Sequence, residues 1–370
     1  RLQVEHPVTE MITGYDIVEH MIKIAAGEKL EFTQEDVKLN GWAFEARICA
    51  EDPSRGFLPS SGRILDYQEP PKNNNIRVDS GVTSGGEVSM YYDAMIAKLC
   101  TYGETRQKAL ELLKASLSSF VIQGISHNIS FLEALVNHPR FAQGDINTNF
   151  IDEEYPNGFS GATITSEINK IFLATTLFVF LIEQKRTSQM PNQLNNQYSK
   201  IGTRWIVSID GKQFPAIIKS VEDGYDIRQE FNRISIRGTW AIGNVLVSTT
   251  INNQKVNVKL ERVKTKYRLN YAGVTVECSV RSPRLAELES LMLNRDDQED
   301  NHELEAPLSG QIIKIIASEG EQVVKGQELL ILTAMKMENI ITAPRSGKIS
   351  KIFISENENV SRGQILIEFE

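Results

Sequence analysis

A lysine between two methionines, in the run Ala334-Met335-Lys336-Met337, is the residue most suggestive of chemistry in this sequence. The run breaks an alternation of apolar residues, which is typical of a turn between two strands. The lysine amine there is either a solvated charge, the ordinary role of an exposed lysine, or a point of covalent attachment. Residue type alone does not decide between the two, so the surrounding elements must.

Lys336 stands between two halves of an internal repeat. Ala306-Pro307-Leu308-Ser309-Gly310 returns 37 residues later as Ala343-Pro344-Arg345-Ser346-Gly347. Val323, Gly326, Gln327 and Leu329 likewise return as Val360, Gly363, Gln364 and Leu366. Each half reads as short strands joined by glycine turns, which predicts an all-β flattened barrel of two interlocking halves. Lys336 then lies on the hairpin that connects them and points outward.

The repeat and its tetrapeptide together resemble the biotinyl domain of biotin-dependent carboxylases, whose attachment motif is Ala-Met-Lys-Met. The likeness covers residues 304–370. Lipoyl domains share the duplicated fold but usually place Asp-Lys-Ala at the hairpin. The resemblance implies that a biotin protein ligase joins biotin covalently to the Lys336 amine. It also implies a long flexible arm on a rigid tip, which raises the effective concentration of biotin at two separated sites.

The opening of the chain carries a second group of charged residues. The run Arg1-Leu2-Gln3-Val4-Glu5-His6-Pro7-Val8-Thr9-Glu10 resembles the end of the ATP-grasp catalytic region of biotin carboxylases. The likeness continues through residues 45–52, 57–60 and 91–93 to about residue 150, with Ala46 where the family usually has Cys. Taken alone, Glu5 and Arg47 would be surface charges.

The resemblance assigns roles to these residues. Arg1, Gln3 and Val4 would hold bicarbonate, with Arg1 among the catalytic groups. Glu5 would be the base that deprotonates bicarbonate, and Arg47 would stabilise the enolate-like form of biotin. The family's nucleotide-binding loop, lysines and metal-binding carboxylates precede this segment. We therefore expect ATP and Mg²⁺ or Mn²⁺ as cofactors of the intact protein, with no metal ligands in this chain, which we expect to be inactive alone.

The middle of the chain changes from a helical to a strand pattern. Residues 163–189 predict one long helix with an apolar stretch, closed by Pro191 and the Asn/Gln-rich run to residue 198. Residues 204–280 show hairpin signals of a small antiparallel barrel or sandwich, and residues 285–293 predict a closing helix. The segments Phe172–Phe180, Met190-Pro191, Gly238-Thr239-Trp240 and Arg284–Leu288 resemble the domain by which propionyl-CoA carboxylase α subunits dock their carboxyltransferase β subunit. The alternative is a spacer domain.

Length and composition limit the number of domains and the classes of function that are possible. At 370 residues the chain is expected to form several domains. The net charge of −8 argues against a nucleic-acid binder. The three cysteines form no metal-binding or disulfide pattern, and the apolar run 171–182 is too short to cross a membrane.

The fold class is α+β multidomain. We expect part of a biotin carboxylase at 1–155, with helices at 15–26, 105–120 and 128–136 and a strand at 41–50. A helix-plus-barrel docking domain (160–294), an acidic linker (295–303) and a biotinyl domain (304–370) follow.

Together, these resemblances imply the biotin-carboxylase and carrier subunit of an acyl-CoA carboxylase. Propionyl-CoA is the expected substrate and a β subunit the expected partner in a hetero-oligomer, with bicarbonate and ATP consumed. The α subunit of methylcrotonyl-CoA or another acyl-CoA carboxylase is an alternative. Another alternative is that this chain by itself is a non-catalytic carrier and docking module. The expected location is the cytoplasm in a bacterium and the mitochondrial matrix in a eukaryote.

Overall fold

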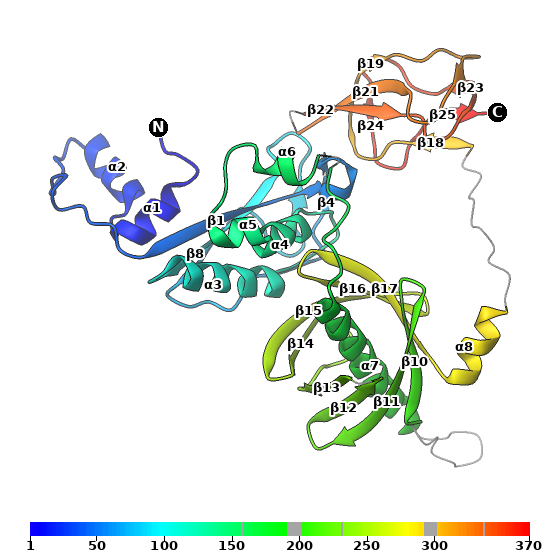
Figure 1. Cartoon of the computed structure of the whole chain (residues 1–370). Helices are drawn as coiled ribbons and strands as arrows, with labels where there is room; N and C mark the ends of the chain where they lie inside the picture. The colour runs from blue at the N-terminus through cyan, green and yellow to red at the C-terminus, as the bar shows by residue number, and fades with distance from the viewer. Residues whose placement is uncertain (157, 191–201, 231, 292–301, 336) are drawn as a thin grey trace.

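The computed structural model describes residues 1–156, 158–190, 202–230, 232–291, 302–335 and 337–370. Figure 1 shows three bodies in chain order: a mixed α/β domain, a barrel wrapped around a helix, and a small all-β domain at the C-terminus. Lys336, the Pro191 segment and the acidic run 296–300 lie outside the described residues.

The first domain is built on a three-stranded antiparallel sheet. Its strands are β1 (Trp42–Cys49), β8 (Met95–Gly103) and β6 (Ile76–Ser80), in the order β1-β8-β6. Helix α3 (Arg106–Ser119) packs against β8 and β1 through the buried residues Leu110, Leu113 and Leu117. It begins where the Thr105 hydroxyl accepts a hydrogen bond from the Lys108 amide, so that the cap satisfies one of the unpaired first-turn donors.

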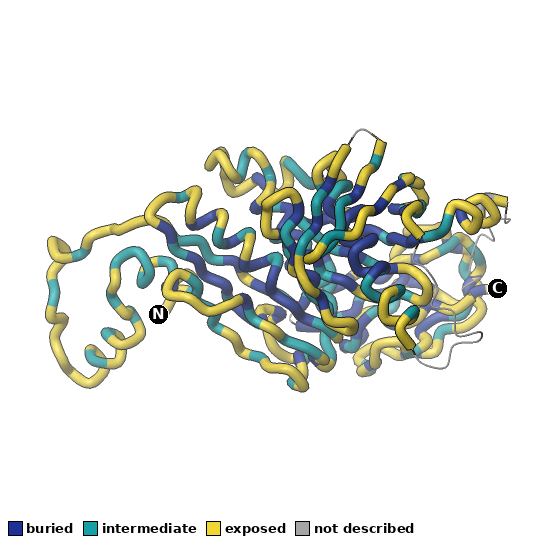
Figure 2. Tube along the Cα trace, turned by 90° about the horizontal axis from the view of Figure 1, so that it is seen from below, coloured by how far each residue is buried: buried dark blue, intermediate teal, exposed yellow. Residues whose placement is uncertain are grey.

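Shorter elements complete this domain. Helices α1 (His6–Thr13) and α2 (Ile17–Ala25) precede the sheet, and the tube coloured by burial shows how little of them is buried (Figure 2). The others are β2 (Glu51–Asp52), η1 (Pro53–Arg55), β3 (Leu58–Pro59), β4 (Gly62–Arg63), β5 (Asp66–Gln68), β7 (Glu87–Val88), β9 (Val121–Gln123), α4 (Ile129–Asn137), α5 (Pro139–Gln143) and α6 (Phe150–Glu154). The helices expected at 15–26, 105–120 and 128–136 and the strand at 41–50 are therefore present, with ends shifted by one or two residues.

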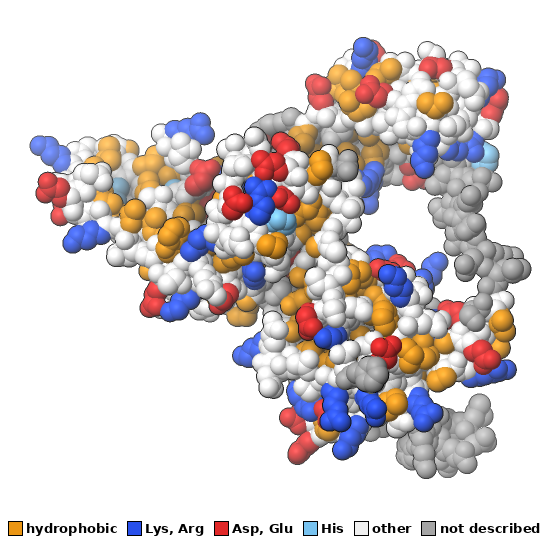
Figure 3. Space-filling view, viewed as in Figure 1, with side chains coloured by type: hydrophobic (Ala, Val, Ile, Leu, Met, Phe, Trp, Pro, Cys, Tyr) orange, Lys and Arg blue, Asp and Glu red, His pale blue; other side chains and the backbone are white. Residues whose placement is uncertain are grey.

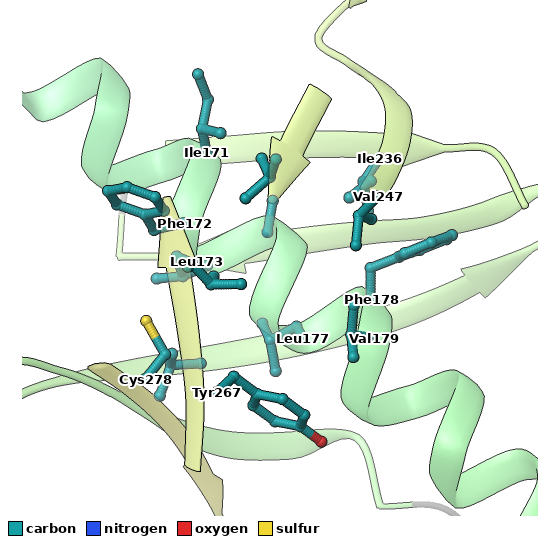
Figure 4. Close-up of a cluster of buried hydrophobic side chains, with 14 of the residues drawn as sticks. Ile171, Phe172, Leu173, Leu177, Phe178, Val179, Ile236, Val247, Tyr267 and Cys278 are labelled. Carbon is teal, nitrogen blue, oxygen red and sulfur yellow. The ribbon is translucent and has the colours of Figure 1, made fainter. Parts of the chain in front are cut away.

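The second domain is a closed antiparallel barrel around helix α7 (Ser166–Ser188). Residues Ile171–Val179 of α7 are all buried, and the helix packs against β10, β12, β13, β14, β16 and β17 (Figure 4). A helix that is apolar all round must be buried on every side, which explains the run of apolar residues. No described helix is long and apolar enough to cross a membrane. The strands are β10 (Arg204–Ile209), β11 (Lys212–Val221), β12 (Gly224–Gln229), β13 (Asn232–Arg237), β14 (Leu246–Ile251), β15 (Gln254–Val263), β16 (Lys266–Tyr271) and β17 (Val274–Arg281).

A closing helix follows the barrel, as expected, but begins earlier than predicted. Helix α8 covers Pro283–Ser290, two residues ahead of the predicted start at 285, and the last two residues of the predicted range 285–293 lie outside the described residues. The reason is local, because Ser282 caps the helix by accepting a hydrogen bond from the Leu285 amide and Pro283 occupies the first turn, where its missing N–H costs nothing.

A buried ion pair joins the first domain to the barrel. Glu133 on α4 and Lys259 on β15 lie 2.8 Å apart, with side chains 3% and 13% exposed. Glu133 also accepts a hydrogen bond from the Gly273 amide, and Lys259 donates to the Leu117 carbonyl. Each charge thus has several partners, and the two domains are fixed to one another at this junction.

We expect Glu133→Ala to destabilise the chain by about 3 to 5 kcal/mol, because it leaves the Lys259 ammonium buried without its counter-charge. Chemical denaturation followed by circular dichroism measures this loss. Glu261→Ala, which removes an exposed carboxylate on the same barrel, is the control and should cost little. Equal, small effects of the two variants would show that the junction does not depend on the ion pair.

The third domain consists of two four-stranded sheets with strand orders β18-β25-β23-β20 and β22-β21-β19-β24. The repeat predicted two similar halves, and strands at equivalent repeat positions occupy matching places in the two sheets. They are β19 (Gly310–Ile315) and β23 (Gly347–Ile352), β20 (Gln322–Val323) and β24 (Asn359–Val360), and β21 (Glu328–Ala334) and β25 (Ile365–Phe369). Strands β18 (Glu303–Glu305) and β22 (Met337–Thr342) complete the sheets. Their inner faces form one core of mostly aliphatic side chains, which confirms the flattened-barrel fold.

Gly326 and Gly363 occupy matching turns with φ of 88° and 81°. Both lie in the left-handed region, where a β-branched side chain is strained. We expect Gly363→Val to destabilise the domain by about 1 to 3 kcal/mol, measured by thermal unfolding. Gly363→Asn is the control, since asparagine tolerates this region, and an unchanged melting temperature in the valine variant would contradict the reading of the turn.

Candidate functional site

Glu5 and Arg47 come together although 41 residues separate them in the chain. Glu5 directly precedes α1, which packs across β1 and β8, and Arg47 projects from β1 on the face opposite Ala46 and Ile48. The Arg47 guanidinium donates a hydrogen bond to the Glu5 carboxylate. The two side chains stay 59% and 44% exposed, for Glu5 and Arg47 respectively, so the pair faces solvent.

A second carboxylate fixes the arginine from within the sheet. Glu45, only 6% exposed, accepts a hydrogen bond from Arg47 Nε at 3.2 Å. Partial burial opposes ionisation of Arg47, but its hydrogen bonds to Glu45 and Glu5 raise the pKa of the guanidinium. Hydrogen bonds from its own backbone and from Arg47 hold the pKa of Glu5 below the ordinary value of 4.5. Glu5 is therefore ionised at neutral pH and Arg47 is held by carboxylates on both sides.

A chain of ion pairs ties the first residues to the sheet. Arg77 on β6 contacts Glu10 at 2.6 Å and Asp79 at 2.8 Å, and Lys98 on β8 lies 3.4 Å from Asp79. Lys98 also donates to the Val4 carbonyl at 3.5 Å. This network positions the segment that carries Glu5 over the strand that carries Arg47.

The remaining predicted bicarbonate ligands lie in the same segment. Arg1 and Gln3 are exposed and Val4 is half-buried. The positive charge of Arg1 contributes to lowering the pKa of Glu5, although less than the hydrogen bonds do. The structure thus brings Arg1, Glu5 and Arg47 together at one surface, beside the backbone of Val4.

The hairpin between β21 and β22 is described on both sides of Lys336. Ala334 at the end of β21 pairs with Met337 at the start of β22, and Met335 follows β21 directly. Met335 has φ of 49° and is buried, whereas Met337 is 39% exposed. The Thr333 hydroxyl and the Asn339 amide both donate to the Met337 carbonyl at 3.2 Å. These bonds stiffen the hairpin next to the predicted attachment residue.

Sequence reasoning did not single out Glu45, Arg77 and Lys98. Glu45 stands two residues from Arg47, and the strand period of two puts both on one face of β1, which was a usable signal. Arg77 and Lys98 come from distant strands, and only the sheet register brings them together. Among the described residues, no group of three or more His, Cys, Asp or Glu side chains is placed to hold a metal ion.

Four family models match successive parts of this chain. Residues 1–33 match the ATP-binding domain of the carbamoyl-phosphate synthase L chain, and residues 45–153 match the biotin carboxylase C-terminal domain. Residues 172–295 match the propionyl-coenzyme A carboxylase BT domain, and residues 302–369 match the model described as biotin-requiring enzyme. The matches follow the three bodies of the structure in order.

Curated relatives extend this likeness over 92% of the chain. The propionyl-CoA carboxylase alpha chain of Ruegeria pomeroyi is 39% identical and its mitochondrial counterpart in mouse 34% identical. The chain spans about half the length of these relatives, 53% and 48% respectively. Among solved structures, the biotin carboxylase domain of Hydrogenobacter thermophilus 2-oxoglutarate carboxylase, in complex with MgADP, ADP and bicarbonate, is 42% identical. The match covers 42% of this chain and 34% of that one, with a TM-score of 0.41.

Proposed function

We propose that this chain, a homologue of propionyl-CoA carboxylase alpha chains that has their biotin carboxylase C-terminal, BT and biotinyl domains, carries biotin on Lys336 and supports its carboxylation. In the whole protein, ATP and bicarbonate would supply the activated carboxyl group. One observation carries the proposal: the Glu5–Arg47 pair and the hairpin formed by β21 and β22 belong to one chain.

The chemistry assigned to this site uses the charges that the structure brings together. Ionised Glu5 would accept the proton of bicarbonate, and Arg1 would attract the anion. The Arg47 guanidinium, held by Glu45, would stabilise the oxyanion that develops on biotin, because a fixed donor needs no reorganisation. When covalently bound, biotin would supply the ring nitrogen that accepts the carboxyl group. Among the described residues, no group of three or more His, Cys, Asp or Glu side chains could hold the metal ion that accompanies ATP.

The acyl-CoA substrate and the partner follow from the relatives. The matched BT domain is named for propionyl-coenzyme A carboxylase, so we propose propionyl-CoA as the substrate and a carboxyltransferase β subunit as the partner that docks on the helix-and-barrel domain. The runner-up is methylcrotonyl-CoA, since the methylcrotonoyl-CoA carboxylase subunit alpha of Dictyostelium discoideum is 33% identical over 92% of the chain.

Reconstitution tests the substrate assignment. A full-length subunit containing this chain, co-expressed with candidate β subunits, should co-purify with one of them and carboxylate propionyl-CoA faster than methylcrotonyl-CoA or acetyl-CoA. A preference for methylcrotonyl-CoA would overturn the substrate while leaving the carrier function in place.

This chain alone supports a narrower alternative, a carrier and docking module without catalysis. ATP cleavage in the presence of free biotin separates the two: we expect none from residues 1–370 and a bicarbonate-dependent rate from the full-length subunit. The compartment in which the protein works depends on the source organism. The mouse and human relatives are named mitochondrial, and we propose the mitochondrial matrix for a eukaryotic source and the cytoplasm for a bacterial one.

A further inference from the structure

The tip of the carrier hairpin packs against the first domain. Met335 is only 3% exposed, and its backbone amide donates a hydrogen bond of 2.7 Å to the Met90 carbonyl. The Met335 side chain belongs to a buried cluster whose other members, Val88 and Ala94 among them, all come from the first domain. Figure 1 shows the β21–β22 hairpin reaching from the C-terminal domain toward this surface.

A second contact lies beside the tip. Leu58, on β3 of the first domain, packs against the hydrophobic core of the carrier domain. A narrow crevice of about 40 Å³ runs between the two domains, lined by Asp52 and Pro59 on one side and by Pro307 and Arg362 on the other. The first domain therefore contacts the carrier domain both at the hairpin and at the loop that begins its repeat.

This contact is slight compared with the junction to the barrel. Helices α3 and α4 pack against β15 and β16 of the barrel, whereas in the described part of the chain the strands β18–β25 make only slight contact with the helices and strands of the first domain. In Figure 3 an open space separates the carrier domain from the barrel. Small interfaces between domains are generally transient, so the carrier domain is suited to leave this surface.

Met335 is also unusual in its backbone. A φ of 49° is uncommon for a residue other than glycine, asparagine or aspartate. Glycine would satisfy the turn but would place no side chain in the cluster. Methionine has a flexible, polarisable side chain that fits irregular apolar gaps. The residue chosen for the turn is thus explained by what it contacts in the other domain.

The docked tip lies at the end of the sheet that holds Arg47. Met90 lies in the segment that leads into β8, and this segment is joined to the end of β1 by the hydrogen bond from the Ala50 amide to the Ala94 carbonyl. We infer that Met335, Met90 and Leu58 form a releasable docking site that holds the carrier tip at the carboxylase domain, with Met335 as a positioning residue that favours tethered over free biotin. The docking is inferred from the contacts alone. The preference for tethered biotin rests in addition on the proposed function.

Solution scattering on this chain tests the docking without any activity. Leu58→Asp places a charge against the carrier core and should release the domain, which raises the radius of gyration. Leu39→Asp, a change at a 73% exposed leucine of the same domain, is the control and should leave the scattering unchanged. If Leu58→Asp scatters like the wild type and the control, this surface is not a docking site in solution.

The positioning role is tested in the reconstituted full-length subunit by the ratio of two rates, carboxylation of its own biotin and of added free biotin. Met335→Ala should lower this ratio about 5-fold to 10-fold through loss of apolar contact, with the free-biotin rate unchanged. Met337→Ala, on the other side of Lys336, is the control, and streptavidin binding must show equal biotinylation of both variants. A ratio unchanged in Met335→Ala, or lowered equally in both, overturns the positioning role.

Failure of the docking can be told apart from failure of the proposed function. A wild-type subunit that carboxylates no form of biotin would refute the proposed function, while the scattering of Leu58→Asp would still decide whether the surface docks the carrier domain. Misfolding of Leu58→Asp would appear in its circular dichroism, and Leu58→Ser then serves as the milder variant with the same expected direction.

Discussion

Replacing Lys336 with arginine should abolish biotinylation completely. Arginine keeps the positive charge and most of the length, but its guanidinium is protonated at any accessible pH and is no acceptor for an activated acyl group, whereas a lysine amine is. The measurement is streptavidin binding after co-expression with a biotin protein ligase. The wild-type chain should give one biotin per chain and Lys336→Arg none.

The matched control is Lys325→Arg. Lys325 is exposed on another turn of the same domain, so it tests whether a lysine of that domain is labelled without the methionine-flanked hairpin. Full biotinylation is expected in this variant. Retained streptavidin binding in Lys336→Arg would place the biotin elsewhere and remove the basis of the carrier function.

Glu5→Gln should lower bicarbonate-dependent ATP cleavage by about 100-fold to 10,000-fold in the reconstituted full-length subunit, the usual range for loss of a general base. The amide keeps the size of the side chain and a hydrogen-bond acceptor but cannot take the proton. Because hydrogen bonds lower the pKa of Glu5, the wild-type carboxylate should stay ionised throughout the neutral range. Glu19→Gln, at the exposed Glu19–Lys23 pair on α2, is the control. A loss of less than 10-fold in Glu5→Gln would argue against the base.

Arg47→Ala should separate the two half-steps. Carboxylation of biotin should fall by about 100-fold to 1,000-fold, as for loss of an oxyanion donor, while bicarbonate-dependent ATP cleavage falls much less. The activated carboxyl group would still form and then decay in water. Arg63→Ala, at an exposed arginine of the same domain, is the control. Equal loss of both activities in Arg47→Ala would mean that the arginine organises the whole site instead, since it also holds Glu5.

Local patterns in the sequence predicted much of this architecture. The repeat required two similar halves, and equivalent strands indeed form the two sheets of the third domain. The largely apolar run from Ile171 predicted a buried helix, and the alternation after residue 204 predicted antiparallel strands. What these patterns did not show is that the strands close around α7, because periodicity indicates which face is buried but not which element covers it.

The site was less predictable, because its geometry depends on long-range contacts. The roles of Glu5 and Arg47 came from resemblance, and their contact requires α1 to cross β1, which no local signal indicates. The burial of Met335 is a clearer case. We expected Lys336 to point outward from its hairpin, and nothing in the local sequence indicated that Met335 beside it would be covered by residues of the first domain, far earlier in the chain.

Transfer of labelled bicarbonate tests the central claim most directly. The full-length subunit, biotinylated and given MgATP and ¹⁴C-bicarbonate, is expected to acquire acid-labile label on the peptide that contains Lys336. That label should move to propionyl-CoA when the β subunit is added. Label that appears on the protein equally in Lys336→Arg, or no label on the biotinylated wild type while ATP is cleaved, would contradict the account of this chain as a carboxyl carrier.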